Sequence, residues 1–126
     1  MSTLNVGNIT DGTNSVATEK LSKGTAAAWV NFDGTGTVSI RGSYNVSSIT
    51  DNGTGKFAIN FSTPLSSADY CVSGTTGPGA GASVIAFDGG SANYVAPTTD
   101  SFIIRCCADS GNEYDRSNVM VVVFSN

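Results

Sequence analysis

The chain has 126 residues, enough for one domain with its own hydrophobic core. Charged residues make up only 13% of it, the net charge is −4, and its six Lys and Arg residues are scattered, so the composition does not provide the basic surface that nucleic-acid binding requires. No apolar run approaches the ~20 residues of a membrane span, and neither nucleic acid nor a membrane is expected as a partner.

Residues 1–25 differ from the rest of the chain, because their apolar side chains are sparse and follow no sustained period. Such a segment cannot bury enough surface to fold alone, so it is either a flexible arm or an arm that orders against another chain. Purely solvating tails seldom keep apolar side chains, and we therefore expect contact with a partner. The candidate contact residues are Leu4, Val6, Ile9, Val16 and Leu21.

The first residues, MSTLNVG, show neither the basic region nor the apolar region of a signal peptide. We therefore expect the chain to be made, and to fold first, in a cytosol.

From residue 26 onward, short runs of strand-forming residues alternate with turn signals rich in Gly, Asn, Asp and Pro. Turns are expected at Asp33-Gly34 and Gly42-Ser43, among others, and a loop is expected over 74–81. This spacing predicts an all-β fold, an antiparallel and jelly-roll-like β-sandwich over 26–126, preceded by an extended N-terminal arm. The expected strands are 27–32, 36–41, 44–50, 56–61, 69–74, 82–88, 100–107 and 117–125.

The clearest local pattern is a hairpin over 46–61. Phe57, Ile59 and Phe61 alternate with polar residues and should face the core. Before them, Val46 should share one face with the residues at 48 and 50. The intervening Asp-Asn-Gly-Thr-Gly segment predicts a turn in which at least one glycine, Gly53 or Gly55, has a positive φ.

The apolar run from Val119 to Phe124 predicts a strand covered on both faces, either central in a sheet or at a subunit contact. The cysteines, Cys71, Cys106 and Cys107, are odd in number, and no signal peptide precedes them. We therefore interpret them as small buried hydrophobic residues, with a vicinal or intermolecular disulfide as the alternative.

Catalytic chemistry is not expected. The chain has no histidine, which removes the most common general base, a common zinc ligand and the Ser-His and Cys-His pairs. The glycines in the segment 33–37 precede a predicted strand rather than a helix, so they indicate a turn and not a phosphate-binding loop. We expect no enzyme activity, no catalytic residues, no cofactor and no bound metal.

An acidic segment and the exposed aromatic residues are the remaining candidates for a binding site. The segment 109–115 carries three carboxylates, and it is read as a solvated acidic loop with a cation site as the alternative. Among the aromatic residues, Trp29 and Tyr70 lie in strand patterns and should be core residues. Tyr94 and Tyr114 lie in polar loops and are the candidate ligand contacts.

One stretch of the sequence resembles a known group of proteins. Residues 28–72, AWVNFDGTGTVSIRGSYNVSSITDNGTGKFAINFSTPLSSADYCV, are similar to a block that recurs in structural proteins of tailed bacteriophages, especially marine and cyanobacterial ones. The lead-in MSTLNVGNITD at residues 1–11 also resembles these proteins, whereas 73–126 lies outside the resemblance. The block occurs in tail fibres, fibre tips and other virion appendages.

The resemblance implies a non-enzymatic structural protein of the virion. A single domain with a short arm and no long shaft favours a knob or decoration protein on the head surface, anchored by its arm to other virion proteins. The alternative is a short tail-fibre or tail-tip protein, which could carry a carbohydrate-binding module for adsorption to a host-surface glycan. By analogy with phage fibres and spikes, the expected assembly is a homotrimer.

Overall fold

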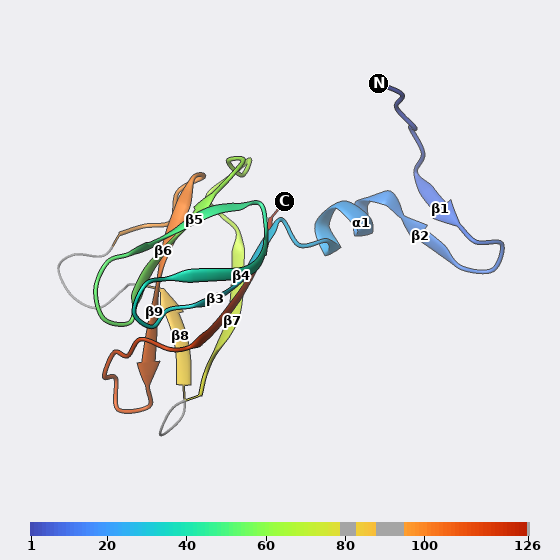
Figure 1. The fold of residues 1–126 in the computed structure, drawn as a ribbon. Helices are drawn as coiled ribbons and strands as arrows, with labels where there is room; N and C mark the ends of the chain where they lie inside the picture. The colour runs from blue at the N-terminus through green and yellow to red at the C-terminus, as the bar shows by residue number, and fades with distance from the viewer. Residues whose placement is uncertain (79–82, 88–94, 126) are drawn as a thin grey trace.

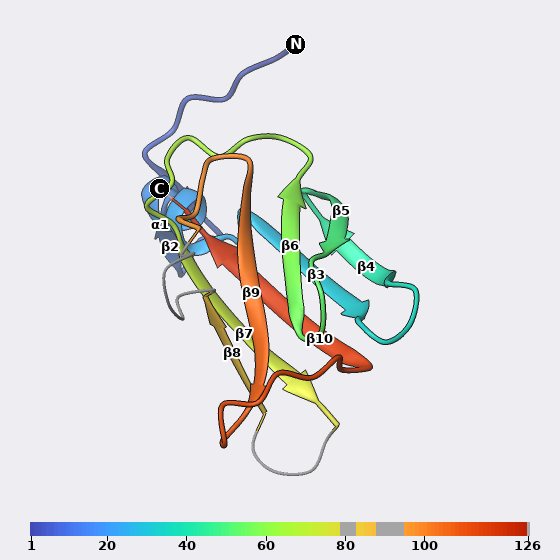
Figure 2. The ribbon, with the colours of Figure 1, turned by 90° about the vertical axis from the view of Figure 1, so that its left-hand side faces the viewer.

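The computed structural model describes residues 1–78, 83–87 and 95–125 of the chain. Its strands from residue 28 onward form two four-stranded antiparallel sheets, with the orders β4-β3-β10-β7 and β5-β6-β9-β8 once the elements are numbered along the chain (Figure 1). The two sheets pack face to face, which confirms the predicted all-β sandwich (Figure 2). The strand bounds are β3 (Ala28–Asp33), β4 (Ser39–Tyr44), β5 (Val46–Asp51), β6 (Lys56–Phe61), β7 (Cys71–Gly77), β8 (Ser83–Phe87), β9 (Ser101–Ala108) and β10 (Asn118–Phe124).

The core lies between the sheets and follows the period-two pattern of the sequence. In β6 every second residue is buried, so the predicted inward facing of Phe57, Ile59 and Phe61 is confirmed. Strand β9 pairs with β6 and repeats the alternation. Phe57 packs edge-on against Phe32 of the opposite sheet, with ring centroids 5.2 Å apart. The buried cluster consists of Ala28, Val30, Phe32, Val46, Phe57, Ile59, Phe61, Phe102, Ile104, Cys106, Val119, Val121 and Val123.

Strand β10 lies in the interior of its sheet, between β3 and β7, as one of the two sequence-based alternatives proposed. It is covered on one face only, because Val119, Val121 and Val123 are buried whereas Met120 and Phe124 are exposed. Its continuous apolar run therefore contributes to the core on one face and forms an exposed apolar surface on the other, which no described residue covers.

The predicted turn at Gly42-Ser43 is wrong. Strand β4 runs through both residues to Tyr44, and the chain passes from one sheet to the other at Asn45, which has a φ of 52°. The side-chain Nδ2 of Asn45 donates to the carbonyl oxygens of Ala27 (3.2 Å) and Thr63 (3.1 Å), and its Oδ1 accepts from the Thr63 N–H (2.8 Å). Asn tolerates this left-handed backbone better than most residues, and its amide joins three segments at the corner.

The hairpin of β5 and β6 has the predicted turn, and both glycines have positive φ values, 115° at Gly53 and 69° at Gly55. The alternation predicted for β5 is interrupted by a bulge between Val46 and Ser48. A bulge shifts the facing of the residues that follow it. As a result Ile49, and not Ser48, packs against the core together with Val46.

Three further predictions need correction. Strand β4 begins at Ser39 and not at residue 36, and β7 continues to Gly77, so residues 74–77 are not a loop. Strand β7 extends because β10 offers a full partner, with Thr75 opposite Met120. Of the cysteines, only Cys106 is buried, whereas Cys71 is exposed. Burial raises the pKa of the Cys106 thiol to about 11, so this thiol stays protonated at neutral pH.

Candidate functional site: the N-terminal arm

Residues 1–25 lie beside the sandwich and not within it, and they fold into a small hairpin and a helix (Figure 1). The hairpin pairs β1 (Asn8–Thr10) with β2 (Ser15–Ala17), and α1 (Thr18–Gly24) follows directly. The segment 1–25, referred to below as the arm, is therefore not one extended segment as the sequence predicted. It joins the sandwich where the Ala27 N–H donates to the Val123 carbonyl oxygen at 2.8 Å.

The hairpin turn spans residues 11–14 and begins with Asp11 and Gly12. The Asp11 carboxylate accepts from the backbone N–H groups of Asn14 (2.7 Å) and Thr13 (3.1 Å), and Gly12 has a φ of 98°. These hydrogen bonds, that from Asn14 first, lower the pKa of Asp11. Asp-Gly is a strong hairpin signal, and with Ile9 and Val16 on either side it could have revealed the hairpin from the sequence.

The start of α1 is tied to the segment before β1. The Thr18 N–H donates to the Gly7 carbonyl oxygen at 2.9 Å, and the Thr18 hydroxyl lies 3.1 Å from the carbonyl oxygen of Val6 and 3.0 Å from that of Gly7. An i,i+4 ion pair between Glu19 and Lys23 (2.7 Å) supports the helix on its exposed side. Thr18 is the only residue among residues 1–25 that is not classed as exposed.

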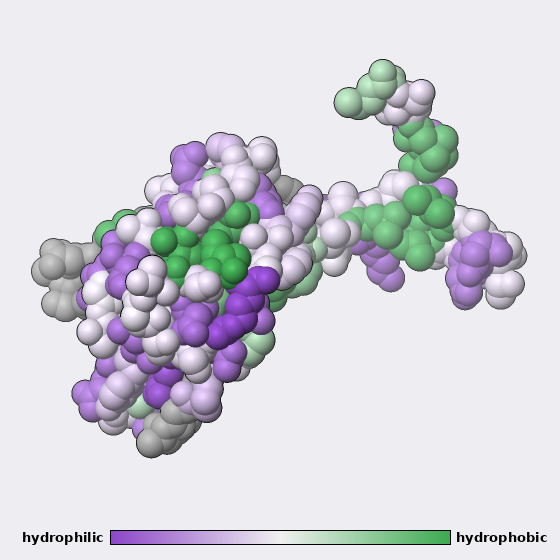
Figure 3. Space-filling model, in the orientation of Figure 1, coloured by the Kyte–Doolittle hydropathy of each residue, from purple (hydrophilic) through white to green (hydrophobic). Residues whose placement is uncertain are grey.

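The arm exposes all five of the candidate contact residues. Ile9 and Val16 are direct partners in the hairpin, so their side chains share one face. Figure 3 shows hydrophobic surface gathered on this arm, away from the sandwich. The relative exposures are 80% for Leu4, 37% for Val6, 51% for Ile9, 38% for Val16 and 42% for Leu21.

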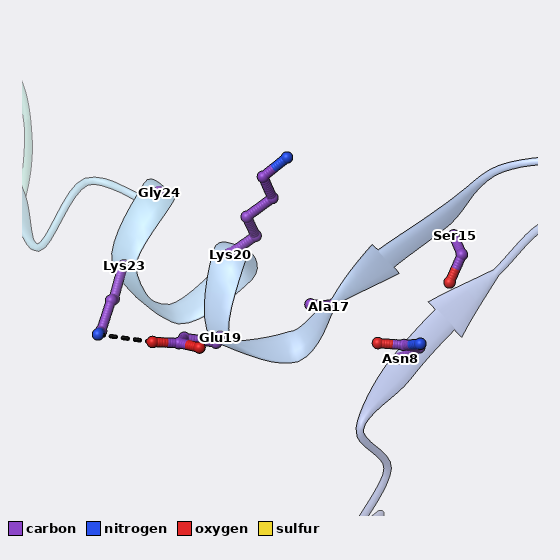
Figure 4. Close-up of a pocket in the computed structure, with 7 residues that line it drawn as sticks. All are labelled: Asn8, Ser15, Ala17, Glu19, Lys20, Lys23 and Gly24. Carbon is purple, nitrogen blue, oxygen red and sulfur yellow. Dashed lines mark hydrogen bonds and ion pairs between the residues drawn. The ribbon is translucent and has the colours of Figure 1, made fainter.

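The opposite face of the hairpin carries polar side chains together with Ala17. A shallow groove of about 720 Å³ is lined by side chains from the hairpin and the helix, including Asn8, Ser15 and the Glu19–Lys23 ion pair (Figure 4). Asn8 and Ser15 precede Ile9 and Val16 in the two strands, and they therefore point to the opposite face. The hairpin thus has one face with Ile9 and Val16 and an opposite face with Asn8 and Ser15.

Such an arm is not stable by itself. A two-stranded hairpin is marginal in water, and a helix of seven residues is shorter than the 12–15 residues at which isolated helices become even marginally stable. The described part of this chain gives α1 no apolar cover either, because none of its residues is buried.

The aromatic residues that the sequence analysis considered differ in their exposure and contacts. Tyr94 lies outside the described residues. Tyr114 is exposed, and its ring stacks with the guanidinium of Arg116 at 4.8 Å. Tyr70 packs against the core and donates its hydroxyl to the Thr98 carbonyl oxygen at 3.0 Å. The prediction that Trp29 is a core residue is wrong, because it is 43% exposed on the outer face of β3.

The acidic loop 109–115 does not gather its carboxylates. Glu113 pairs with Arg105 and lies 3.9 Å from Lys56 Nζ, whereas the Asp115 carboxylate accepts from the Gly55 N–H at 2.7 Å. Asp109 accepts from the backbone N–H of Ser110. Within the described ranges no three His, Cys, Asp or Glu side chains are grouped so that they could hold a metal ion.

Fold and arm together define a β-sandwich domain with an exposed, partly apolar N-terminal arm. Comparison of the chain with protein-family models, with curated proteins and with solved structures found no match. In the portion of the chain that the structure describes, no helix is both long and apolar enough to cross a bilayer.

Proposed function

We propose that this chain is a non-enzymatic structural protein of a bacteriophage virion, a small knob on the head surface that is anchored through its N-terminal arm. The observation that carries the proposal is the arm itself, whose apolar side chains are exposed although its strands and helix are too short to be stable alone. The absence of histidine from the sequence supports a role without catalysis. The protein is made in the host cytoplasm and ends in the particle.

The anchor works by burying the apolar side of the arm against another virion protein or a sister subunit. Ordering each residue costs roughly 1–2 kcal/mol of backbone entropy, so side-chain contacts alone are insufficient. Addition of the hairpin to the edge of a partner's sheet would supply backbone hydrogen bonds as well. By analogy with phage fibres and spikes we assign three copies to the assembly, which predicts a sedimentation mass three times the 12.8 kDa of one chain.

The test is attachment to particles that lack the native protein. A variant starting at Thr25 should fold, because the core contains no residue before Ala28, but it should not attach. In the full chain, Ile9→Ser with Val16→Ser should reduce occupancy strongly. The matched control, Asn8→Ala with Ser15→Ala, changes the same strands on the polar side and should attach normally. Undiminished attachment of the truncated variant would show that the arm is not the anchor.

The second candidate function is a short tail-fibre or tail-tip protein that adsorbs to a glycan on the host surface. The exposed indole of Trp29 favours it, since a surface tryptophan joins a large apolar face to a polar edge. Labelled antibody against the protein, imaged on intact particles, separates the two: label over the head supports the knob, and label at the tail supports the fibre.

A further inference from the structure

Strand β7 forms the border of its sheet, and its outer side is unpaired. Its seven residues, Cys71–Gly77, pair with β10 on one side. In the described part of the chain no strand pairs with the other side, and no further backbone hydrogen bond of these residues is found (Figure 2). An edge strand of this kind presents a row of N–H and C=O groups to any extended segment that reaches it.

The other three sheet edges are less open to pairing. Proteins blunt an edge with a charge, a proline, a bulge or a short strand. The pairing of β4 skips the charged Arg41, that of β5 skips Ser47, and β8 has only five residues. By contrast, β7 contains no charged residue and no proline, and its register with β10 is regular over all seven residues. It is therefore the edge best suited to accept a strand.

A small apolar cleft lies between β7 and β8 at the same border of the sandwich. Its volume is about 50 Å³, and none of its described lining residues has a polar side chain. Phe87 remains 40% exposed, although its ring packs against Phe102 with centroids 6.1 Å apart. The core is therefore only partly covered here. The lining consists of Val72, Gly74, Ile85, Ala86, Phe87 and Ile104.

Residues 1–7 provide a segment that matches this edge. They precede β1 and belong to no helix or strand. Leu4 and Val6 are two residues apart, so they share one side of an extended chain, and both are exposed. Residues 1–5 form no hydrogen bond with the rest of the described chain. The segment thus has unpaired backbone groups and one apolar side, as strand addition requires.

Charge and register support the match. Residues 2–10 contain no Asp, Glu, Lys or Arg, so pairing with β7 removes no charge from water. Antiparallel pairing is the more stable arrangement. In the register that places Leu4 opposite Gly74 and Val6 opposite Val72, both apolar side chains point to the cleft, which Gly74 and Val72 line. Gly74 has no side chain that would obstruct Leu4.

The arm is placed to reach a neighbouring subunit and not its own β7. It leaves the sandwich where Ala27 bonds to Val123, and Val123 is the β10 partner of Val72. Lys23, near the end of α1, lines a pocket together with Cys71. From this point the helix and the hairpin carry residues 1–7 away from the sandwich (Figure 1). Each subunit thus offers one segment and one edge, and a head-to-tail contact of this kind can close into a ring such as a trimer.

We propose that residues 2–7 of one subunit pair with β7 of a sister subunit as an antiparallel fifth strand of its sheet, with Leu4 and Val6 in the cleft beside Phe87. This inference rests on the proposed function, because it assigns a partner to part of the same arm. The hairpin face with Ile9 and Val16 is left for the contact with another virion protein.

Native Cys71 is exposed, so the pairing can be tested by cross-linking of the full-length protein. In the proposed register Gly7 lies opposite Cys71, at the Cα separation of about 4.5–5.5 Å that a disulfide can span. A Cβ at Gly7 meets no atom within 4 Å, so Gly7→Cys should fold normally. Under mild oxidation this variant should form disulfide-linked oligomers, and adding Cys71→Ser should abolish them.

Ser2→Cys is the matched control for the direction of the strand, because residue 2 lies at the far end of β7 from Cys71 and should not form a link to it. A link through Ser2→Cys would overturn the antiparallel pairing. A Gly7→Cys variant that forms no link to Cys71, or forms one only within a single chain, would overturn the exchange between subunits.

Sedimentation of the purified protein separates this proposal from the anchor proposal. Leu4→Ser with Val6→Ser should raise the dissociation constant of the oligomer by about 100-fold, since two apolar side chains lose their cover. The matched control, Thr3→Ala with Asn5→Ala, changes the opposite side of the same segment and should assemble as the wild type does. Equal effects of the two double variants would contradict the facing of Leu4 and Val6.

The two proposals can fail independently. A full-length chain that sediments as a 12.8 kDa monomer, while the variant starting at Thr25 still does not attach to particles, would refute the exchange and leave the anchor standing. An oligomer that cross-links as expected, together with undiminished attachment of the truncated variant, would support the exchange and refute the anchor.

Discussion

Replacement of Asn45 tests how the chain passes from one sheet to the other. Asn45→Gly keeps the left-handed backbone available but removes the three side-chain hydrogen bonds to Ala27 and Thr63. At about 0.5–1.5 kcal/mol each, and with Asn45 only partly buried, the expected loss in the free energy of unfolding is about 2–3 kcal/mol. Asn45→Ala loses the same bonds and adds about 1–2 kcal/mol of strain at a φ of 52°.

Asn45→Gly also makes the unfolded chain more flexible, which lowers the stability of this variant by roughly 0.5–1 kcal/mol. This loss offsets part of the strain that is present only in Asn45→Ala. Asn45→Ala should therefore be about 1 kcal/mol less stable than Asn45→Gly. Urea titration followed by circular dichroism, with linear extrapolation to water, measures both values. An alanine variant that equals or exceeds the glycine variant in stability would refute the strain argument. A loss below about 0.5 kcal/mol in Asn45→Gly would refute the role of the amide.

Three more predictions concern the core and the hairpin. Phe57→Ala should lower the free energy of unfolding by about 3–5 kcal/mol, because the ring is fully buried against the opposite sheet. Lys56→Ala should lower it by less than about 1 kcal/mol. Equal losses in urea titrations would contradict the facing of β6. Gly55→Val should be the more damaging of two glycine replacements, by about 2 kcal/mol over Gly53→Val, since a Cβ at Gly55 meets backbone atoms at 2.8 Å and one at Gly53 meets none. Because burial raises the thiol pKa of Cys106, the thiol of the unfolded chain ionises at a lower pH than that of the folded chain, and stability should fall as the pH rises from about 9 to about 11. Cys106→Ala should show a shallower fall in stability over the same pH range. An unchanged slope in this variant would speak against burial of the thiol.

The strands that alternate cleanly were predictable from the sequence because one face is core and the other is solvent. Strand β6 is the best case, with Phe57, Ile59 and Phe61 buried as expected. Strand β7 was less visible, since Thr75 and its glycine neighbours indicate a loop. It becomes a strand because β10 lies beside it, and a non-local partner leaves no trace in a short window of sequence.

The candidate sites were only partly predictable. The apolar residues of the arm could be found because Leu4 and its counterparts interrupt a polar segment. Trp29 was misassigned to the core because it lies in a strand pattern, although its position between the inward-facing Ala28 and Val30 places it on the outer face.

The position of β10 beside β3 also sets the timing of folding during synthesis. Trp29 pairs with Val122, a partner that lies far along the chain, and pairing of this kind has a high contact order and is intrinsically slow. While the ribosome is still making residues 118–124, β3 has only β4 as a neighbour in its sheet, and the base of the arm lacks its bond to Val123. The arm therefore emerges first from the ribosome but is fixed to a finished sandwich last.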